Sequence, residues 1–294
     1  MIISTLCYDN GCHANRVLQT SSDVQSSKFD KYRNQGCVIR YNNFDDPASL
    51  ESAFQGCEKL FLVSTPRISM DYNDAPHGKG REAHHFVAIG AVRKVGVKHI
   101  YYTSLAFGNP SKAGVMRAHI RTEEYLKGLK DVKYTIIREG LYNESWPLYF
   151  GYYLKDEDRK KLIVAGDGKI SWTSIADLGF GTAKVLTGRE EDWAGKTFYL
   201  SQKRTKTLKE IAELVSEAKG TSVQLDVRSR EEYEHYYVEK MGLERASVEW
   251  WSSSYDAVKD GECDITDSTL EDIFKEAGRK PKPMEETVKE MILA

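Results

Sequence analysis

The stretch Lys59-Leu-Phe-Leu-Val-Ser64 is a continuous apolar run of the length of one β-strand. Such runs are typical of strands that are buried on both faces of a parallel sheet. A loop follows, then a helical pattern over residues 80–95 that Gly96 closes, and then a second apolar strand over residues 97–104. Strand, helix and strand in this order make a βαβ unit, whose two strands are parallel and whose crossover is right-handed.

The same alternation continues on both sides of this unit. Asp46 and Pro47 start one helix, because aspartate is a good N-cap and proline fits the first helical position. The other predicted segments are strands over 16–22, 37–41, 134–138, 162–164 and 196–201, helices over 27–35, 116–129, 174–186 and 207–220, and a largely helical end over 230–294.

This order predicts an α/β fold class, a Rossmann-like doubly wound parallel sheet with a small C-terminal lobe. Residues 1–150 would form the Rossmann-like core. Residues 151–294 would add the remainder of the sheet and a helical lobe within the same compact domain. A chain of this length can form one such domain around a single core.

Composition narrows the class of protein. Hydrophobic residues make up 40% of the chain and charged residues 29%, which is an ordinary globular balance. The formal net charge of -2 gives no field that would recruit nucleic acid or an anionic membrane, and no apolar run approaches the ~20 residues that cross a bilayer. We therefore expect a cytoplasmic protein without nucleic-acid or membrane partners.

The cysteines are odd in number and scattered, which disfavours a disulfide framework and a zinc site. We expect reduced thiols and no metal, with Cys37 and Cys57 buried as small apolar side chains. The adjacent His84 and His85 lack the i, i+4 spacing of a metal pair and should point to different sides of their helix.

Several stretches, in the same order, resemble one known family. They are Phe44-Asp-Asp-Pro-Ala-Ser-Leu50, Leu60-Phe-Leu-Val-Ser-Thr65, Gly96-Val-Lys-His-Ile-Tyr-Tyr-Thr-Ser-Leu105, His119-Ile-Arg-Thr-Glu-Glu-Tyr-Leu126, Tyr134-Thr-Ile-Ile-Arg-Glu-Gly-Leu-Tyr-Asn143, Gly166-Asp-Gly-Lys-Ile170 and Gly278-Arg-Lys-Pro281. Together they resemble the NmrA-like family of atypical short-chain dehydrogenases, in particular its type 2 NAD(P)H:quinone oxidoreductases. The resemblance spans residues 16–290.

The resemblance implies an NADP or NAD site along the carboxyl ends of the strands, where open α/β sheets bind ligands. His119 stands where many relatives have a lysine that contacts the nicotinamide ribose, and Tyr142 with Asn143 would line the substrate side. The implied cofactor-binding residues are Ser64, Thr65, Pro66, Thr103, Ser104, Leu105, His119, Gly140, Leu141 and Tyr142.

Each of these residues also has a structural interpretation. Ser64 and Thr103 can end their strands by bonding backbone groups, and His119 can be a surface histidine. The catalytic residue is unknown; Tyr142 is the one candidate, although a half-buried aromatic wall is the favoured role for it. Trp250 and Trp251 are expected to pack the C-terminal lobe rather than to wall a substrate pocket.

Other patterns indicate no chemistry. The pairs Glu123-Glu124 and Glu231-Glu232 are expected on solvated faces. The Tyr-x-x-x-Lys from Tyr236 to Lys240 lies far from the helix where short-chain dehydrogenases use that motif, and we interpret it as chance.

The N-terminal region departs from the family pattern. Relatives open their first strand into Gly-x-x-Gly-x-x-Gly and a helix, whose amides bind the pyrophosphate. The residues before Arg16 contain only Gly11, and Met1–Leu6 is the segment that can substitute for a first strand. After the strand over 16–22 comes Asp23, which suits a ribose hydroxyl as in NAD sites, with no cation before Lys28 for the 2′-phosphate of NADP.

These features predict an NmrA-like NAD(P)H-dependent oxidoreductase that transfers hydride from the nicotinamide to a quinone-like or conjugated carbonyl acceptor. The alternative is a non-catalytic cofactor sensor or regulator that acts through a protein partner, and the altered N-terminus favours it relative to a typical member. A third hypothesis is an altered product of an active parent gene.

Overall fold

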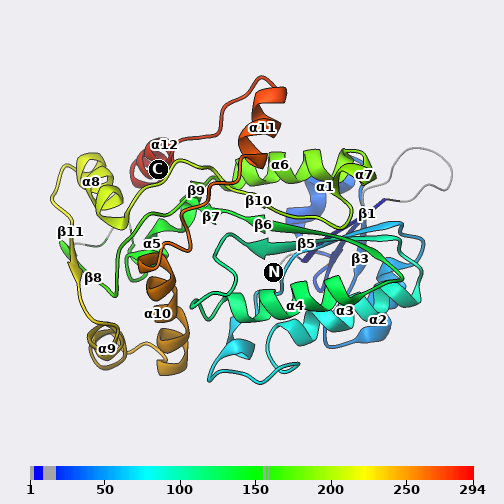
Figure 1. Ribbon diagram of the computed structural model, residues 1–294, viewed down its shortest axis with the longest axis horizontal. Helices are drawn as coiled ribbons and strands as arrows, with labels where there is room; N and C mark the ends of the chain where they lie inside the picture. Colours follow the sequence, from blue (N-terminus) through cyan, green and yellow to red (C-terminus); the bar gives the residue numbers. More distant parts are fainter. Residues whose placement is uncertain (1–2, 9–17, 155–156, 158) are drawn as a thin grey trace.

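The protein is described by a computed structural model that covers residues 3–8, 18–154, 157 and 159–294 (Figure 1). A seven-stranded sheet has the order β10-β6-β5-β4-β1-β2-β3. Its strands are β1 Ile3–Tyr8, β2 Leu18–Ser21, β3 Val38–Tyr41, β4 Lys59–Leu62, β5 His99–Leu105, β6 Lys133–Glu139 and β10 Thr197–Leu200. This is the doubly wound order that the sequence predicts.

One strand runs against the others. β1 pairs antiparallel with both β2 and β4, whereas every other pair in the sheet is parallel. A strand does occupy the first-strand position, as the sequence indicates for the N-terminal segment, but its direction is reversed. The amino end of β1 therefore lies at the edge where β2 and β4 have their carboxyl ends.

Helices cover both faces of the sheet (Figure 1). On one face lie α2 Pro47–Phe54, α3 Glu82–Lys94 and α4 Met116–Gly128; on the other lie α6 Ile175–Thr187 and α7 Glu190–Trp193. The α2 helix starts as predicted, because the Asp46 carboxylate accepts hydrogen bonds from Ala48 N at 3.1 Å and Ser49 N at 3.3 Å. The predicted helix over 27–35 is instead a 3₁₀ turn, Ser27–Phe29, followed by the short α1, Asp30–Asn34.

Most of the remaining elements form the C-terminal lobe, on the left of Figure 1. Its core is aromatic: Tyr149 makes edge-to-face contacts with Trp172, Trp251 and Tyr255. The lobe contains β7 Leu141–Tyr142, α5 Trp146–Tyr149, β8 Lys161–Val164, β9 Trp172–Thr173, α8 Leu208–Lys219, β11 Gln224–Val227, α9 Arg230–His235, a π-helical turn Tyr236–Lys240, α10 Arg245–Lys259 and α12 Met284–Leu293. The helix α11 Thr269–Glu276 packs instead against α6 and β10 of the sheet. None of the helices in the described ranges is long and apolar enough to cross a bilayer.

The lobe is joined to the sheet through the segment that follows β6. Gly140 N donates to Leu200 O of β10 at 2.8 Å, and β7 then pairs in parallel with β9. A Cβ atom on Gly140 would lie 2.4 Å from Thr173 Oγ1 of β9. Only glycine therefore allows the turn before β7 to lie this close to β9. Residues 141–143 are thereby held at the carboxyl edge of the sheet.

Candidate active site

The carboxyl ends of β4 and β5 lie side by side and carry the polar residues that the sequence singles out. Ser64 N, just after β4, donates a hydrogen bond of 3.1 Å to Thr103 Oγ1 on β5. Thr65 is buried and Pro66 is exposed at the start of the loop that leaves the edge. The structure therefore brings the predicted residues after β4 together with Thr103.

The side chain of His85 on α3 contacts the segment that follows β4. Its Nε2 accepts from Thr65 N at 3.2 Å and lies 3.1 Å from Ser64 Oγ. A backbone N–H can only donate, so the ring proton is on Nδ1, which lies 2.8 Å from Thr122 Oγ1. Burial and the nearby Arg81 guanidinium hold the pKa of His85 well below its usual range, so His85 is a neutral imidazole that holds the backbone after β4.

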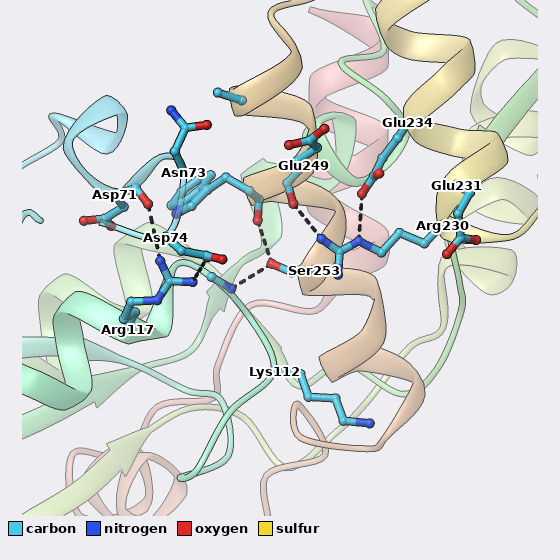
Figure 2. A pocket seen from close by; sticks show the side chains of 13 residues that line it. Asp71, Asn73, Asp74, Lys112, Arg117, Arg230, Glu231, Glu234, Glu249 and Ser253 are labelled. Atoms are coloured by element: carbon cyan, nitrogen blue, oxygen red, sulfur yellow. Dashed lines mark hydrogen bonds and ion pairs between the residues drawn. The ribbon is translucent and has the colours of Figure 1, made fainter. Parts of the chain in front are cut away.

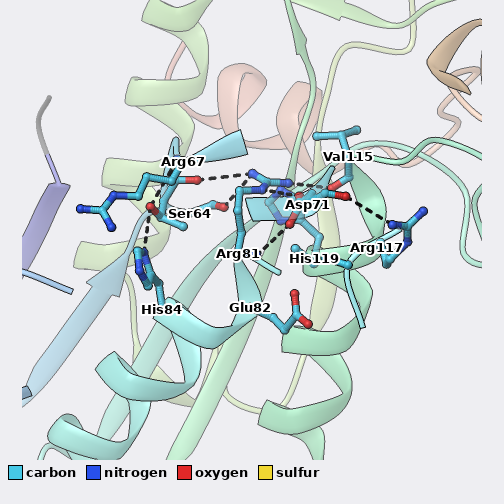
Figure 3. A network of polar contacts seen from close by, with 12 residues as sticks. Ser64, Arg67, Asp71, Arg81, Glu82, His84, Val115, Arg117 and His119 are labelled. Carbon is cyan, nitrogen blue, oxygen red and sulfur yellow. Dashed lines mark hydrogen bonds and ion pairs between the residues drawn. The ribbon is translucent and has the colours of Figure 1, made fainter. Parts of the chain in front are cut away.

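Arg81 fixes the loop that follows β4 (Figure 3). Its Nε donates to Asp71 Oδ2 at 2.6 Å, and its backbone N donates to Asp71 Oδ1 at 2.7 Å, with both side chains almost fully buried. Its Nη2 also donates to Val115 O at 2.8 Å, at the start of α4. One buried ion pair thus joins the loop, α3 and α4 behind the site.

His84, next to His85 on α3, also contacts the segment after β4. Its Nδ1 lies 3.4 Å from Thr65 Oγ1, its Nε2 lies 3.3 Å from Asp45 Oδ1, and its ring stacks on Phe44. The two histidines thus contact different groups of Thr65, His85 its backbone N–H and His84 its hydroxyl.

His119 on α4 is buried, which excludes the interpretation as a surface histidine. Its Nδ1 lies 2.9 Å from the hydroxyl of Tyr102 on β5, and that hydroxyl lies 3.4 Å from His85 Nδ1. Burial lowers the pKa of His119 well below its usual range, and the positive charge of Arg81 adds to the effect. His119 is therefore neutral, and a role at the nicotinamide ribose stays a prediction.

Glu123 does not lie on a solvated face; that expectation was wrong. Glu123 is fully buried and forms two hydrogen bonds with Arg138 of β6, at 3.0 Å and 2.7 Å. Ser104 Oγ donates to the same carboxylate at 2.7 Å, so its hydroxyl is directed toward α4 rather than out of the edge. The signal in the sequence was Arg138 itself, because an arginine inside an apolar strand needs a buried counterion.

The opposite face of the edge, toward α6, contains a cavity of about 340 Å³. Most of its wall is apolar, and its polar groups come from Thr103, Glu139, Tyr142 and Thr182. The full lining is Phe61, Val63, Thr103, Glu139, Tyr142, Ile175, Leu178, Gly179, Thr182, Ala183 and Leu186. Thr103 and Tyr142 are the two predicted site residues that this cavity brings together.

Glu139, the last residue of β6, is the acidic group of this cavity, and the sequence analysis did not select it. Thr182 Oγ1 donates to Glu139 Oε1 at 3.4 Å. Burial raises the pKa of Glu139 to about 7, although hydrogen bonds from Thr182 and Tyr142 oppose the shift. Burial, together with the charge of Glu139, also raises the pKa of the Tyr142 phenol above its usual range.

Three other predicted residues serve the junction with the lobe. Leu105 is half-buried at the end of β5, and Leu141 is buried in the β7–β9 pair. Asn143 is fully buried, and its Nδ2 donates to Thr287 Oγ1 of α12 at 3.0 Å. The structure therefore places Asn143 beneath α12 and not on the lining of the cavity.

A second cavity, of about 450 Å³, lies between the loop after β4 and the C-terminal lobe (Figure 2). Its walls carry charges that are largely paired: Arg117 binds Asp74, and Arg230 Nε binds Glu234 at 2.7 Å. Gly114 N donates to Ser253 Oγ at 2.7 Å and bridges the two sides. Trp250 and Trp251 are buried and pack the lobe as predicted, although Trp250 also lines this cavity.

Comparison with known proteins places the chain in a family. No family model matches the sequence. The NmrA-like family domain-containing oxidoreductase flvB of Aspergillus flavus is 30% identical over 279 residues, which are 93% of this chain and 85% of that protein. The chain belongs to the NmrA-like family. This confirms the family that the sequence motifs resemble.

Solved structures of two reductases share the fold of this NmrA-like chain. The NADPH-dependent quinone oxidoreductase QOR2 of Escherichia coli, in complex with NADPH, has a TM-score of 0.75 and 26% identity, covering 93% of this chain and 89% of that one. Triphenylmethane reductase of Citrobacter sp., in complex with NADP(H), has a TM-score of 0.74 and 26% identity, covering 93% and 90%. The predicted Rossmann-like α/β fold is therefore confirmed.

Proposed function

We propose that this NmrA-like chain is an NAD(P)H-dependent oxidoreductase that reduces a quinone-like or conjugated carbonyl acceptor, as a cytoplasmic enzyme. The relatives reported above are named oxidoreductase or reductase, and two of them were solved with NADPH or NADP(H). The regulatory alternative is not favoured, because the relatives reported above are oxidoreductases or reductases at 26–30% identity, whereas the negative transcriptional regulator NmrA shares the fold at only 12% identity.

The cavity beside Thr103 and Tyr142 is the observation that carries this proposal. It lies at the carboxyl ends of β4, β5 and β6, where open α/β sheets bind their ligands. Its volume of about 340 Å³ and mostly apolar wall suit a planar ring system, because small-molecule sites are typically apolar cavities with a few polar groups. Thr103 Oγ1 accepts from Ser64 N and donates to no group among the described residues, so its own O–H can donate to a carbonyl oxygen of a ligand.

The chain's residues suit the nicotinamide end of the cofactor. Val63, Thr103 and Tyr142 would hold the ring, and a bound nicotinamide supplies the hydride. At the pyrophosphate position, the described part of the chain contains no glycine-rich turn that leads from a strand into a helix, since β1 is reversed and Gly11 lies outside the described residues. Exposed Asp23, just after β2, stays the predicted partner of a ribose hydroxyl.

Cofactor binding is tested by titrating NADPH and NADH separately into the purified protein. We expect a rise in melting temperature and energy transfer from tryptophan to the nicotinamide, followed by faster cofactor oxidation with at least one acceptor from a panel of quinones and conjugated ketones. Protein that binds neither nucleotide would contradict the proposal. Binding without turnover of any acceptor would favour a cofactor sensor instead.

His119→Ala tests the residue that relatives replace by lysine. If His119 contacts the ribose, the Kd for NADPH should rise about tenfold, which corresponds to the loss of roughly one hydrogen bond. His77→Ala is the matched control, because His77 is exposed in the loop after β4. An unchanged Kd in His119→Ala would remove His119 from the cofactor site.

A further inference from the structure

We infer that Glu139 is the acid that protonates the reduced acceptor, with Tyr142 orienting its carboxyl group. This inference rests on the proposed oxidoreductase function and adds to it the residue that supplies the proton. Among the described residues that line the cavity beside Thr103, Glu139 supplies the one carboxyl group.

Because side chains alternate between the two faces along β6, the side chain of Glu139 points into the cavity. Successive strand residues point to opposite faces of a sheet. Arg138 points toward α4, where it binds Glu123, and Glu139 points toward α6, where it binds Thr182. The last residue of β6 therefore presents its carboxyl group on the cavity side of the carboxyl edge.

The burial of Glu139 in mostly apolar surroundings favours the protonated acid. No lysine or arginine is among the described residues that line the cavity. The groups that face the carboxyl group are hydroxyls, from Thr182 on α6 and Tyr142 on β7, and the rest of the lining is mostly apolar. Burial in these surroundings raises the pKa of Glu139 to about 7, which matches an acid that works near neutral pH.

Tyr142 is a weaker donor than Glu139. Burial and the neighbouring carboxyl groups of Glu139 and Glu144 raise the pKa of its phenol above the usual range. The phenol thus keeps its proton and acts as a hydrogen-bond donor to Glu139, which fixes the orientation of the carboxyl group. This agrees with the sequence-based preference for Tyr142 as a wall of the site rather than as the acid.

The reaction balances with one hydride and one proton. A bound reduced nicotinamide would supply the hydride: its C–H bond would break, a new C–H bond would form in the acceptor, and an oxyanion would be left at the acceptor's carbonyl oxygen while the cofactor loses two electrons. The O–H bond of the Glu139 carboxyl then breaks, and a new O–H bond forms at the acceptor oxygen. Water returns a proton to the Glu139 carboxylate before the next turnover.

The test compares wild-type protein with Glu139→Gln, which keeps the shape of the side chain but cannot supply the proton. We expect kcat to fall by about 10²–10⁴, the usual contribution of a positioned acid, with the Kd for NADPH unchanged. In wild type kcat should be constant at acid pH and should decline as the pH rises through about 7, because only protonated Glu139 is active. The variant should lack this inflection.

Glu217→Gln is the control, since Glu217 is an exposed carboxylate on α8. Its kcat and pH profile should match wild type. A Glu139→Gln protein with wild-type kcat and the same inflection would overturn this inference alone. Wild-type protein that binds NADPH but reduces no acceptor would overturn the proposed function as well, so the two failures are distinguishable.

A thermal measurement checks the acid without relying on turnover. The folded-state pKa lies above the ordinary carboxyl value of 4.5, so the native state holds the Glu139 proton that the unfolded chain releases. Wild type should therefore lose stability relative to Glu139→Gln as the pH rises from about 5 to about 8.5. A melting-temperature difference that is the same at both ends of this range would contradict the inference.

Discussion

At the scale of single residues, buried charges determine the shape of the site. Glu123 and Arg138 hold α4 against β6, and Asp71 with Arg81 holds the loop after β4 against α3. Such pairs are costly to desolvate, but removing one partner leaves an isolated buried charge. We therefore expect these residues to be sensitive to substitution although they do not line the cavity beside Thr103.

Glu123 is the buried counterion of Arg138. Replacing Glu123 by Gln leaves the Arg138 guanidinium buried without a counterion, and the free energy of unfolding should fall by about 3–5 kcal/mol. Urea denaturation followed by circular dichroism measures this change. Glu124→Gln is the control, because Glu124 is exposed. This substitution should lower the free energy of unfolding by less than about 0.5 kcal/mol. A loss below about 1 kcal/mol for Glu123→Gln would show that the pair is unimportant for stability.

At the scale of the elements, the sequence predicts where strands and helices lie better than how they pair. The apolar run at residues 59–64 and the cap at Asp46 are local signals, and β4 and α2 follow them closely. The direction of β1 is not local, because it depends on backbone bonds to β2 and β4 across the sheet. The burial of Glu123 is also long-range, since the helical pattern of α4 does not show which residue of β6 faces it.

The turn after β6 allows a prediction about packing. Gly140→Ala should destabilise the protein by about 1–3 kcal/mol, because the added methyl group overlaps Thr173 Oγ1 and forces β7 and β9 apart. Gly90→Ala in α3 meets no atom within 4 Å and should stabilise the protein by about 0.5–1 kcal/mol. Thermal unfolding of both variants checks the pair. Equal effects in the two variants would contradict the close approach at Gly140.

At the scale of the whole molecule, the fold brings the end of the sheet and the C-terminal lobe to the same region. The family motifs in the sequence identify the carboxyl edge, and the structure places Thr103 and Tyr142 together there. Glu139 could not be selected from the sequence, because its importance comes from Thr182 of α6, which lies 43 positions away along the chain. Asn143 also belongs to the family motif over residues 134–143, but its side chain binds Thr287 of α12 and does not line the cavity.

Hydride transfer in a single turnover tests the central claim most directly. Protein saturated with NADPH is mixed rapidly with an excess of a quinone, and the absorbance of the reduced nicotinamide is followed. We predict a decay equivalent to one NADPH per protein molecule, much faster than the decay in the same mixture without protein. Bound NADPH that is oxidised no faster than free NADPH, with every acceptor in the panel, would contradict the assignment of this NmrA-like chain as an oxidoreductase.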